Sequence, residues 1–125
     1  MREIEDIAEE WIKVWSDGKI PAVGDGVSES ILDWELPREQ PEKCFDIILV
    51  VLEKIKHQTD NRLLSILAAG PLEDLLHENG GKVVDRVEIN ARKNPLFRKL
   101  LNGVWDSEVK ESVKSQLSKY MDERW

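Results

Sequence analysis

Apolar residues recur at steps of three and four along most of the chain, the period of an α-helix with one buried face. The first apolar stripe ends near Gly18, and the second follows Pro41, a residue suited to the first position of a helix. The two stripes consist of Ile4, Ile7, Ala8, Trp11, Ile12 and Trp15, and of Ile47, Ile48, Val51, Leu52 and Ile55. Between them, residues 18–40 predict a long connection with one short helical turn, capped by Ser28 and carrying Trp34.

The second half of the chain keeps the same period and is interrupted by Gly-Pro and Asn-Pro corners. Its apolar groups are Leu63, Leu64, Ile66 and Leu67; Leu72, Leu75 and Leu76; Val83, Val84, Val87 and Ala91; Phe97, Leu100, Leu101 and Val104; and Val109, Val113, Leu117, Tyr120 and Met121. We expect Asn94 and Pro95 to restart a helix that Trp105 closes, and a final helix from about Ser107.

No stretch shows the alternation of a strand, so the sequence predicts an all-α fold. A chain of this length fits one domain, residues 1–125, built as a compact bundle of about six short helices. Short helices joined by tight corners are typical of stacked antiparallel pairs, as in HEAT-like repeats, although no internal sequence repeat is evident.

The corner AAGPLEDLLHENG, residues 68–80, contains two adjacent carboxylates. Proline lacks an N–H group and clashes with the preceding turn, so Gly70 and Pro71 predict a break in the helix. A new helix starting at Pro71 would place Glu73 and Asp74 in its first turn, where the positive end of the helix dipole favours carboxylates. We therefore expect structural roles for both residues.

Further structural pairs are predicted beyond this corner. Gly80 or Gly81 would end the short helix in the left-handed conformation that glycine accepts. Glu88 and Arg92 have the favourable i, i+4 order for an ion pair. Arg98 is expected to pair with a carboxylate, either one of the two in the corner or Glu88, rather than to bind an anion.

The corner and the segment DRVEINARKNPLFRKLLNGVW, from Asp85 to Trp105, resemble a bacterial domain family of unknown function. The pattern of that family is an A-G-P-L-E-D-L-L corner, an acidic-arginine helix, N/D-P-x-F-R and a terminal G-V-W. The resemblance covers about residues 62–105, which separates a family-like half, residues 61–125, from residues 1–60. It implies a bacterial helical domain and no particular activity.

The composition excludes several classes of protein. The formal net charge is −7, whereas a general nucleic-acid binder needs a basic face, so we expect no direct nucleic-acid partner. No apolar run approaches the ~20 residues that span a bilayer, and the acidic N-terminus lacks the features of a signal peptide. A single cysteine, Cys44, fits a reducing compartment. The predicted location is the cytoplasm.

The residues that favour chemistry are few. Asp74 and His77 have D-x-x-H spacing, but a dimetal site in a helix bundle requires two such elements and two more carboxylates, and His57 has no matching partner. Adjacent carboxylates on a helix point about 100° apart, so Glu73 and Asp74 make a poor acid–base pair. Cys44 has no histidine with a reason to approach it, and no glycine-rich phosphate loop is present. We expect no catalytic residue, metal or cofactor, and no enzyme.

Charge is distributed unevenly along the chain. Residues 1–60 contain 15 acidic and 7 basic side chains, whereas residues 61–125 contain 10 acidic and 11 basic ones. An aromatic anchor among carboxylates is typical of a surface that binds a basic protein. The predicted partner-binding residues are Asp17, Asp25, Glu29, Asp33, Trp34, Glu35 and Glu39. The other interpretation is a solvated acidic loop with Trp34 folded inward.

Two functional hypotheses follow from these patterns. The first is a small acidic protein that masks a basic partner, in its concrete form an immunity protein that neutralises a nuclease toxin by mimicking phosphate charge. The second is a helical scaffold or regulatory module with no toxin partner. A neighbouring gene for a large secreted toxin with a basic C-terminal domain would favour the first.

Overall fold

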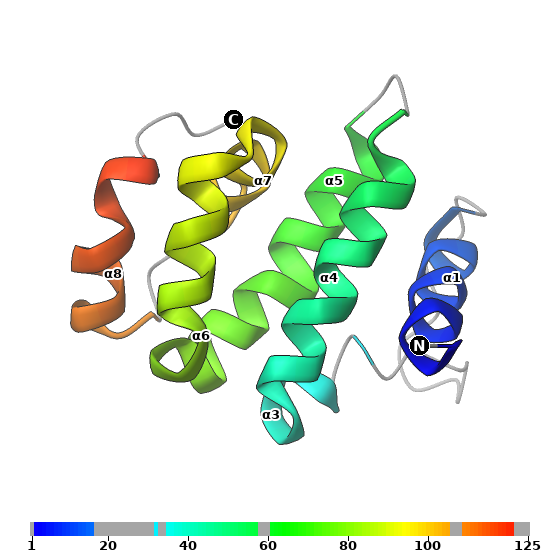
Figure 1. Cartoon of the computed structure of the whole chain (residues 1–125), viewed down its shortest axis with the longest axis horizontal. Helices are drawn as coiled ribbons and strands as arrows, with labels where there is room; N and C mark the ends of the chain where they lie inside the picture. Colours follow the sequence, from blue (N-terminus) through cyan, green and yellow to red (C-terminus); the bar gives the residue numbers. More distant parts are fainter. Residues whose placement is uncertain (1, 17–31, 33–34, 58–60, 106–108, 122–125) are drawn as a thin grey trace.

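The computed structural model describes residues 2–16, 32, 35–57, 61–105 and 109–121, and every regular element in these ranges is a helix. The elements are α1 (Arg2–Ser16), α3 (Leu36–Glu39), α4 (Pro41–Ile55), α5 (Arg62–Leu67), the π-helix η1 (Ala68–Leu72), α6 (Glu73–Lys93), α7 (Pro95–Leu101), α8 (Glu111–Leu117) and the 3₁₀-helix η2 (Ser118–Tyr120). The helices form a row from α1 at one end to α8 at the other (Figure 1). The prediction of an all-α bundle is confirmed.

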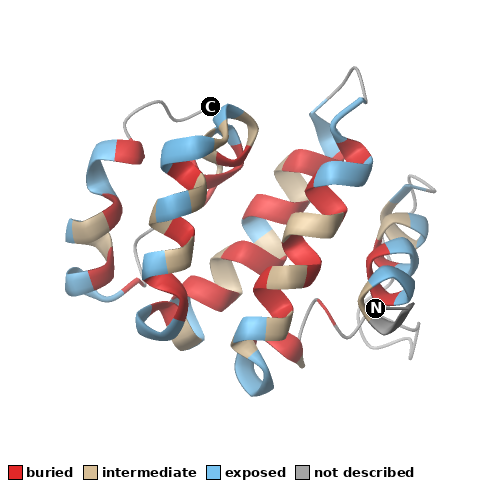
Figure 2. Ribbon diagram, in the orientation of Figure 1, coloured by how far each residue is buried: buried red, intermediate tan, exposed pale blue. Residues whose placement is uncertain are grey.

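One apolar core runs through this row, and buried positions face the neighbouring helices (Figure 2). Trp11, Phe45 and Phe97 bring large aromatic side chains into it from three helices, and each is fully buried. The rings of Phe45 and Phe97 meet edge to face, 5.7 Å apart at 78°, an arrangement that the charge distribution of aromatic rings favours. Burial of the apolar stripes that the sequence shows is therefore the main force that assembles the helices.

Helix α1 packs against α4 through its apolar stripe. Ile7, Ala8 and Trp11 are buried in this interface. Polar contacts lie around it: Lys54 Nζ of α4 is 2.9 Å from Glu5 Oε2, and Arg62 of α5 donates to the backbone carbonyl of residue 15. Residues 2–16 thus belong to the same core as the rest of the described chain.

The predicted break at Gly70–Pro71 is wrong, because helical structure continues from α5 through η1 into α6. Pro71 is buried inside η1, where the wider π-turn accommodates a residue without an N–H group and relieves the clash with the preceding turn. The N–H group of Glu73 bonds to the carbonyls of Ala68 and Gly70. No free helix N-terminus exists at this point, so the dipole argument for the adjacent carboxylates does not apply.

The chain turns instead at Asn79, whose φ of −142° and ψ of 30° interrupt α6. The chain descends through α5 and rises along the later part of α6 (Figure 1). The side-chain amide of Asn79 donates to the backbone carbonyls of Pro37 and Arg38 at 2.8 and 3.0 Å. These bonds join the corner to α3, a segment about 40 residues earlier in the chain.

The glycines after this corner have a different role from the predicted one. Neither Gly80 nor Gly81 adopts the left-handed conformation. Gly80 is buried, and a Cβ atom built on it would lie 3.2 Å from a methyl carbon of Val113 in α8. The missing side chain therefore permits close packing of α6 against α8 rather than a helix end.

The C-terminal elements follow the sequence in part. The predicted cap is confirmed, because Asn94 Oδ1 accepts a hydrogen bond from the N–H of Leu96 at 3.0 Å and Pro95 is the first residue of α7. Helix α8 begins at Glu111, later than the predicted start near residue 107, and residues 106–108 lie outside the described ranges. Trp105 is 70% exposed.

Candidate functional site: an acidic end of the bundle

Four carboxylates from two distant segments gather at one end of the bundle. Glu35 and Glu39 flank α3, while Asp74 and Glu78 lie on the first turns of α6, against which α3 packs. Arg38 lies among them, with its Nε atom 3.6 Å from Glu78 Oε2. This cluster of five residues, the acidic end, has four carboxylates and one guanidinium group. Its formal charge is −3 when every carboxylate is ionised.

The surface of the acidic end is open to solvent. Glu35, Arg38, Glu39 and Gln40 line a hollow on it. The side chains of Arg38 and Glu78 are 50% and 33% exposed, so their ion pair is well solvated and adds little to stability. Solvated charges of one sign are suited to attracting a partner of the opposite sign.

Asp74 has a raised pKa in the folded protein. Burial raises the pKa of its carboxyl group, and the negative charges of Glu73 and Glu78 raise it further, whereas Arg38 and His77 act in the opposite direction. A carboxyl group whose pKa is raised by burial and by like charges is more common at functional sites than elsewhere.

The pKa of Cys44 is also raised, first by burial and then by the charge of Asp74. The thiol is buried in α4, and a raised pKa disfavours the thiolate that a nucleophile requires. Nothing in this environment activates the sulfur atom.

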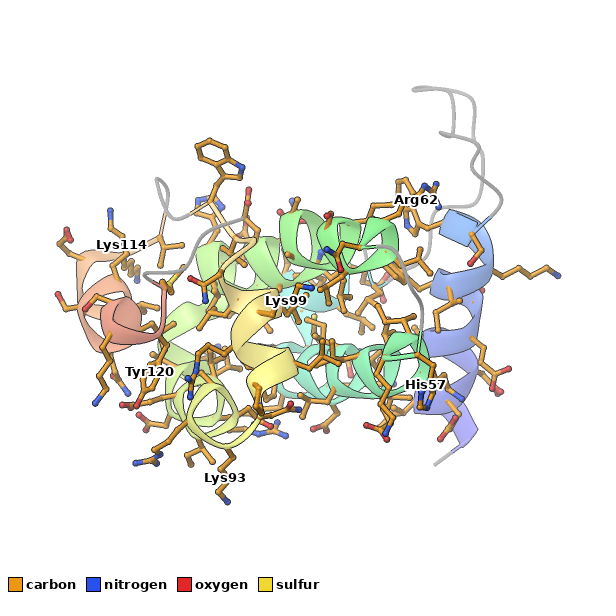
Figure 3. All side chains as sticks on the ribbon, turned by 90° about the horizontal axis from the view of Figure 1, so that it is seen from above. His57, Arg62, Lys93, Lys99, Lys114 and Tyr120 are labelled. Atoms are coloured by element: carbon orange, nitrogen blue, oxygen red, sulfur yellow. The ribbon has the colours of Figure 1, made fainter. Side chains whose placement is uncertain are left out.

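Basic side chains occur at the opposite end of the helices, where α4 and α6 end. Figure 1 shows α3 and the α6 corner at one end, and the C-terminal ends of α4 and α6 at the other. Figure 3 looks down on that second end, where His57, Arg62, Lys93 and Lys99 are labelled. Helices α4 and α6 each carry acidic residues in the first turn and basic residues in the last. In α4 this arrangement offsets the helix dipole, whereas α6 continues from η1 without a free N-terminus, so only the basic residues of its last turn act in this way.

The structure describes only two of the seven residues predicted to bind a partner. Asp17, Asp25, Glu29, Asp33 and Trp34 lie outside the described residues. Glu35 and Glu39 are described and belong to the acidic end, where the structure brings them together with residues about 40 positions later.

The predicted structural residues have partners other than the expected ones. Glu88 accepts hydrogen bonds from Gln116 Nε2 at 2.9 Å and from the Tyr120 hydroxyl at 3.5 Å, and among the described residues it forms no ion pair with Arg92. The guanidinium of Arg98 donates to the carbonyls of residues 91 and 92 instead of a carboxylate. The last carbonyls of α6 lack helical partners, so Arg98 caps them, and the predicted ion pair is wrong.

Sequence reasoning missed three members of this region. Arg38 and Glu78 were not singled out, because no local pattern shows that α3 returns to α6. Trp105 was expected to close a packed segment, yet it is 70% exposed, and its N–H donates to Glu73 Oε1 at 3.0 Å. One signal for its exposure was available, since Trp105 follows directly after the last apolar residue that packs inward, Val104.

The described residues contain neither an evident metal-binding cluster nor a helix that could span a membrane. No group of three or more His, Cys, Asp or Glu side chains is arranged there to hold a metal ion. None of the helices in the described ranges is both long enough and apolar enough to cross a membrane.

Comparison with protein families identifies residues 27–125 with DUF6869, a family of unknown function. The match covers about four fifths of the chain, and the chain belongs to this family. It extends well beyond residues 62–105, so α3, α4 and the acidic residues from Glu29 onward lie inside the family region, whereas α1 precedes it. Comparison with curated proteins and with solved structures finds no match. A HEAT-like arrangement stays a prediction.

Proposed function

We propose that this member of DUF6869 is a protein-binding protein whose acidic end docks on a basic surface of its partner. The observation that carries the proposal is the meeting of Glu35 and Glu39 with Asp74 and Glu78 around a single arginine. Two segments far apart in the sequence contribute charge of one sign to one exposed surface. Such a surface raises the rate of association with an oppositely charged protein.

The concrete form of this function is an immunity protein that masks the cleft of a nuclease toxin. A nuclease cleft is basic because it binds phosphates, and a row of carboxylates can occupy the same charges. The role requires recognition and no chemistry. It is also compatible with the basic side chains at the opposite end, because charges at a distance beyond about 8–10 Å are largely screened at physiological salt.

A charge-reversed variant with a matched control tests the proposal. Glu35→Lys with Glu39→Lys reverses two negative charges at the acidic end, and Asp6→Lys with Glu10→Lys makes the same change in net charge on the exposed side of α1. Each protein is used to capture partners from the native host at low salt, and captured proteins are identified after elution with salt. We expect the wild type and the α1 control to retain the same basic protein and the α3 variant to lose it.

Kinetics with the purified partner sharpen the result. The association rate of the α3 variant should fall about tenfold or more, and high salt should reduce the wild-type rate in the same way. Growth of cells that express the partner, with and without this protein, then tests toxin neutralisation. A partner without a basic surface, or equal rates for the two variants, would favour the helical scaffold over the acidic mask.

A further inference from the structure

Trp105 has a fixed backbone and a free side chain. The indole is 70% exposed, the largest exposure among the described large hydrophobic residues. The residue before it, Val104, is 1% exposed and belongs to the core. The exposed indole is a large aromatic surface that a partner can bury.

The turn that carries Trp105 is held by hydrogen bonds on both sides. The N–H groups of Gly103 and Val104 donate to the carbonyls of Leu100 and Leu101 at 3.0 and 3.2 Å. The amide of Asn102, a buried polar residue, donates at 2.8 Å to the carbonyls of residues 98 and 120, and so joins the turn to η2. The position of the Trp105 backbone is therefore set before any partner arrives, which reduces the entropy that binding would cost.

Glu73 supplies the last of these bonds. One of its carboxylate oxygens, Oε1, accepts the backbone N–H of Trp105 at 3.0 Å, so a negative charge is bonded to the residue that carries the exposed indole. A carboxylate has about four acceptor sites, and this bond uses one of them. The pair thus combines an exposed aromatic ring with a carboxylate that still has free acceptor sites.

We infer that Trp105 and Glu73 form an arginine-binding anchor on this protein. A guanidinium group is planar, stacks on indole rings and donates two parallel hydrogen bonds to a carboxylate, so one arginine side chain satisfies both members of the pair. The inference rests on the proposed function, because it names the contact by which a basic partner would be held after its charge has brought it near. The partner that the anchor fits is a basic protein segment that contains arginine.

The charges around the anchor agree with this assignment. The cations of the preceding helix are directed elsewhere: Arg98 bonds to the end of α6, and Lys99 donates to Asn61 at the start of α5. The carboxylate of Glu73 therefore attracts a cationic ligand and repels an anionic one.

The anchor can be tested without knowledge of the partner. The probe is a short glycine–serine peptide with two arginines, and the matched peptide carries citrulline, which has the same shape without the charge. Proton–nitrogen NMR spectra of the tryptophan indoles report binding, and the Trp105 signal is assigned with a Trp105→Leu variant. We expect the arginine peptide to shift the Trp105 signal selectively and the citrulline peptide to leave it in place.

Substitution of the carboxylate separates the two halves of the anchor. Glu73→Gln keeps an oxygen that accepts the Trp105 N–H and removes the charge, so the fold is retained while the peptide binds several-fold more weakly. Glu111→Gln, at an exposed position on α8, is the matched control and should leave peptide binding unchanged. An unmoved Trp105 signal, equal shifts with citrulline, or equal binding by Glu73→Gln would overturn the inference.

Binding to the natural partner keeps the two proposals distinguishable. If a basic partner binds and Trp105→Ala weakens it by about tenfold or more, through faster dissociation, both proposals stand. If that partner binds Trp105→Ala as tightly as the wild type, the anchor is rejected and the acidic end remains. A Trp105 signal that moves with the concentration of this protein alone would assign the indole to self-association and reject the anchor.

Discussion

Trp11 and Trp105 place the same side chain in opposite environments. Trp11 is fully buried between α1 and the rest of the bundle, with its ring 6.4 Å from that of Trp15. Trp105 is 70% exposed, on a turn whose backbone is fixed by hydrogen bonds and by Glu73. In the first region, burial of side chains holds the backbone in place. In the second, polar contacts hold the backbone and leave the side chain to the solvent.

This contrast distinguishes residues that stabilise the fold from residues that are available to contact a partner. The region around Trp11 has an apolar interface with solvated ion pairs at its edge, so its contribution is to folding. The region around Trp105 exposes an aromatic surface that is bonded to Glu73, and the next residue along α6, Asp74, is a carboxyl group whose pKa is raised by burial and by like charges. Features that cost free energy in the folded protein are typical of surfaces kept for function.

The largest effect is expected at the buried tryptophan. Trp11→Ala removes a fully buried aromatic side chain and leaves a cavity, so it should lower the free energy of unfolding by about 3–5 kcal/mol. The Tm, followed by circular dichroism, should fall by about 10 °C or more. A variant as stable as the wild type would show that α1 does not belong to the core.

Asp74→Asn is expected to raise the free energy of unfolding at pH 7, by less than Trp11→Ala lowers it. Because burial raises the pKa of this carboxyl in the folded state, the stability it contributes is present below its unfolded pKa and is lost as pH rises through the higher folded pKa. Asp74→Asn should therefore be more stable than the wild type at pH 7. The difference should shrink as the pH falls and Asp74 becomes protonated in both states.

Urea unfolding of both proteins from pH 3 to pH 8 measures this difference. Glu111→Gln on α8 provides the control for a general loss of negative charge. A variant that is less stable than the wild type at pH 7 would mean that Asp74 is held by favourable contacts, and the contrast between the two regions would weaken.

The exposed tryptophan should contribute little to stability. Trp105→Ala is expected to change the free energy of unfolding by no more than about 0.5 kcal/mol, because the side chain is mainly in water and the alanine keeps the N–H that bonds to Glu73. Thermal unfolding next to Trp11→Ala measures the contrast directly. A loss comparable with that of Trp11→Ala would make Trp105 a packing residue.

The smallest effect is expected at the ion pairs that surround α1. Lys54 lowers the pKa of Glu5, and the pKa of Lys54 is itself raised, yet both groups are solvent-exposed. Lys54→Met should leave the Tm within error of the wild type at 150 mM salt, since solvated pairs contribute little. Any difference should appear only at low salt and vanish in acid, where Glu5 is protonated. A clear loss at high salt would show that polar contacts help to hold α1.

Local patterns determined most of the secondary structure and the core. The period of three to four residues marks the faces of α1 and α4, and Asn94 with Pro95 starts α7 as expected, because caps and buried stripes depend on neighbours a few positions away. Most residues predicted to pack inward, such as Phe97 and Val104, are buried, whereas Ile4, Ile12, Trp15 and Ile66 are partly buried against the core.

The sequence marked where the helices could be interrupted, but it did not determine the backbone conformation at those positions. A Gly-Pro pair costs an isolated helix enough to end it, yet burial of Pro71 and Leu72 in the bundle keeps η1 helical. The turn occurs at Asn79 because its amide finds the carbonyls of Pro37 and Arg38. Contacts between α3 and α6, which lie about 40 residues apart in the sequence, decided that the chain bends at Asn79 and not at Gly70–Pro71.

The candidate site depends on tertiary structure for the same reason. The sequence marked Glu35 and Glu39 as acidic and assigned Asp74 to a helix end, but it did not show that α3 returns to α6 and gathers them around Arg38. It identified Trp105 as a large apolar residue, and only the packing of Val104 on one side and of Glu73 on the other left the indole in water. Composition and period are fixed by the order of residues, whereas the position of a charge or the exposure of a ring depends on which distant segments pack beside it.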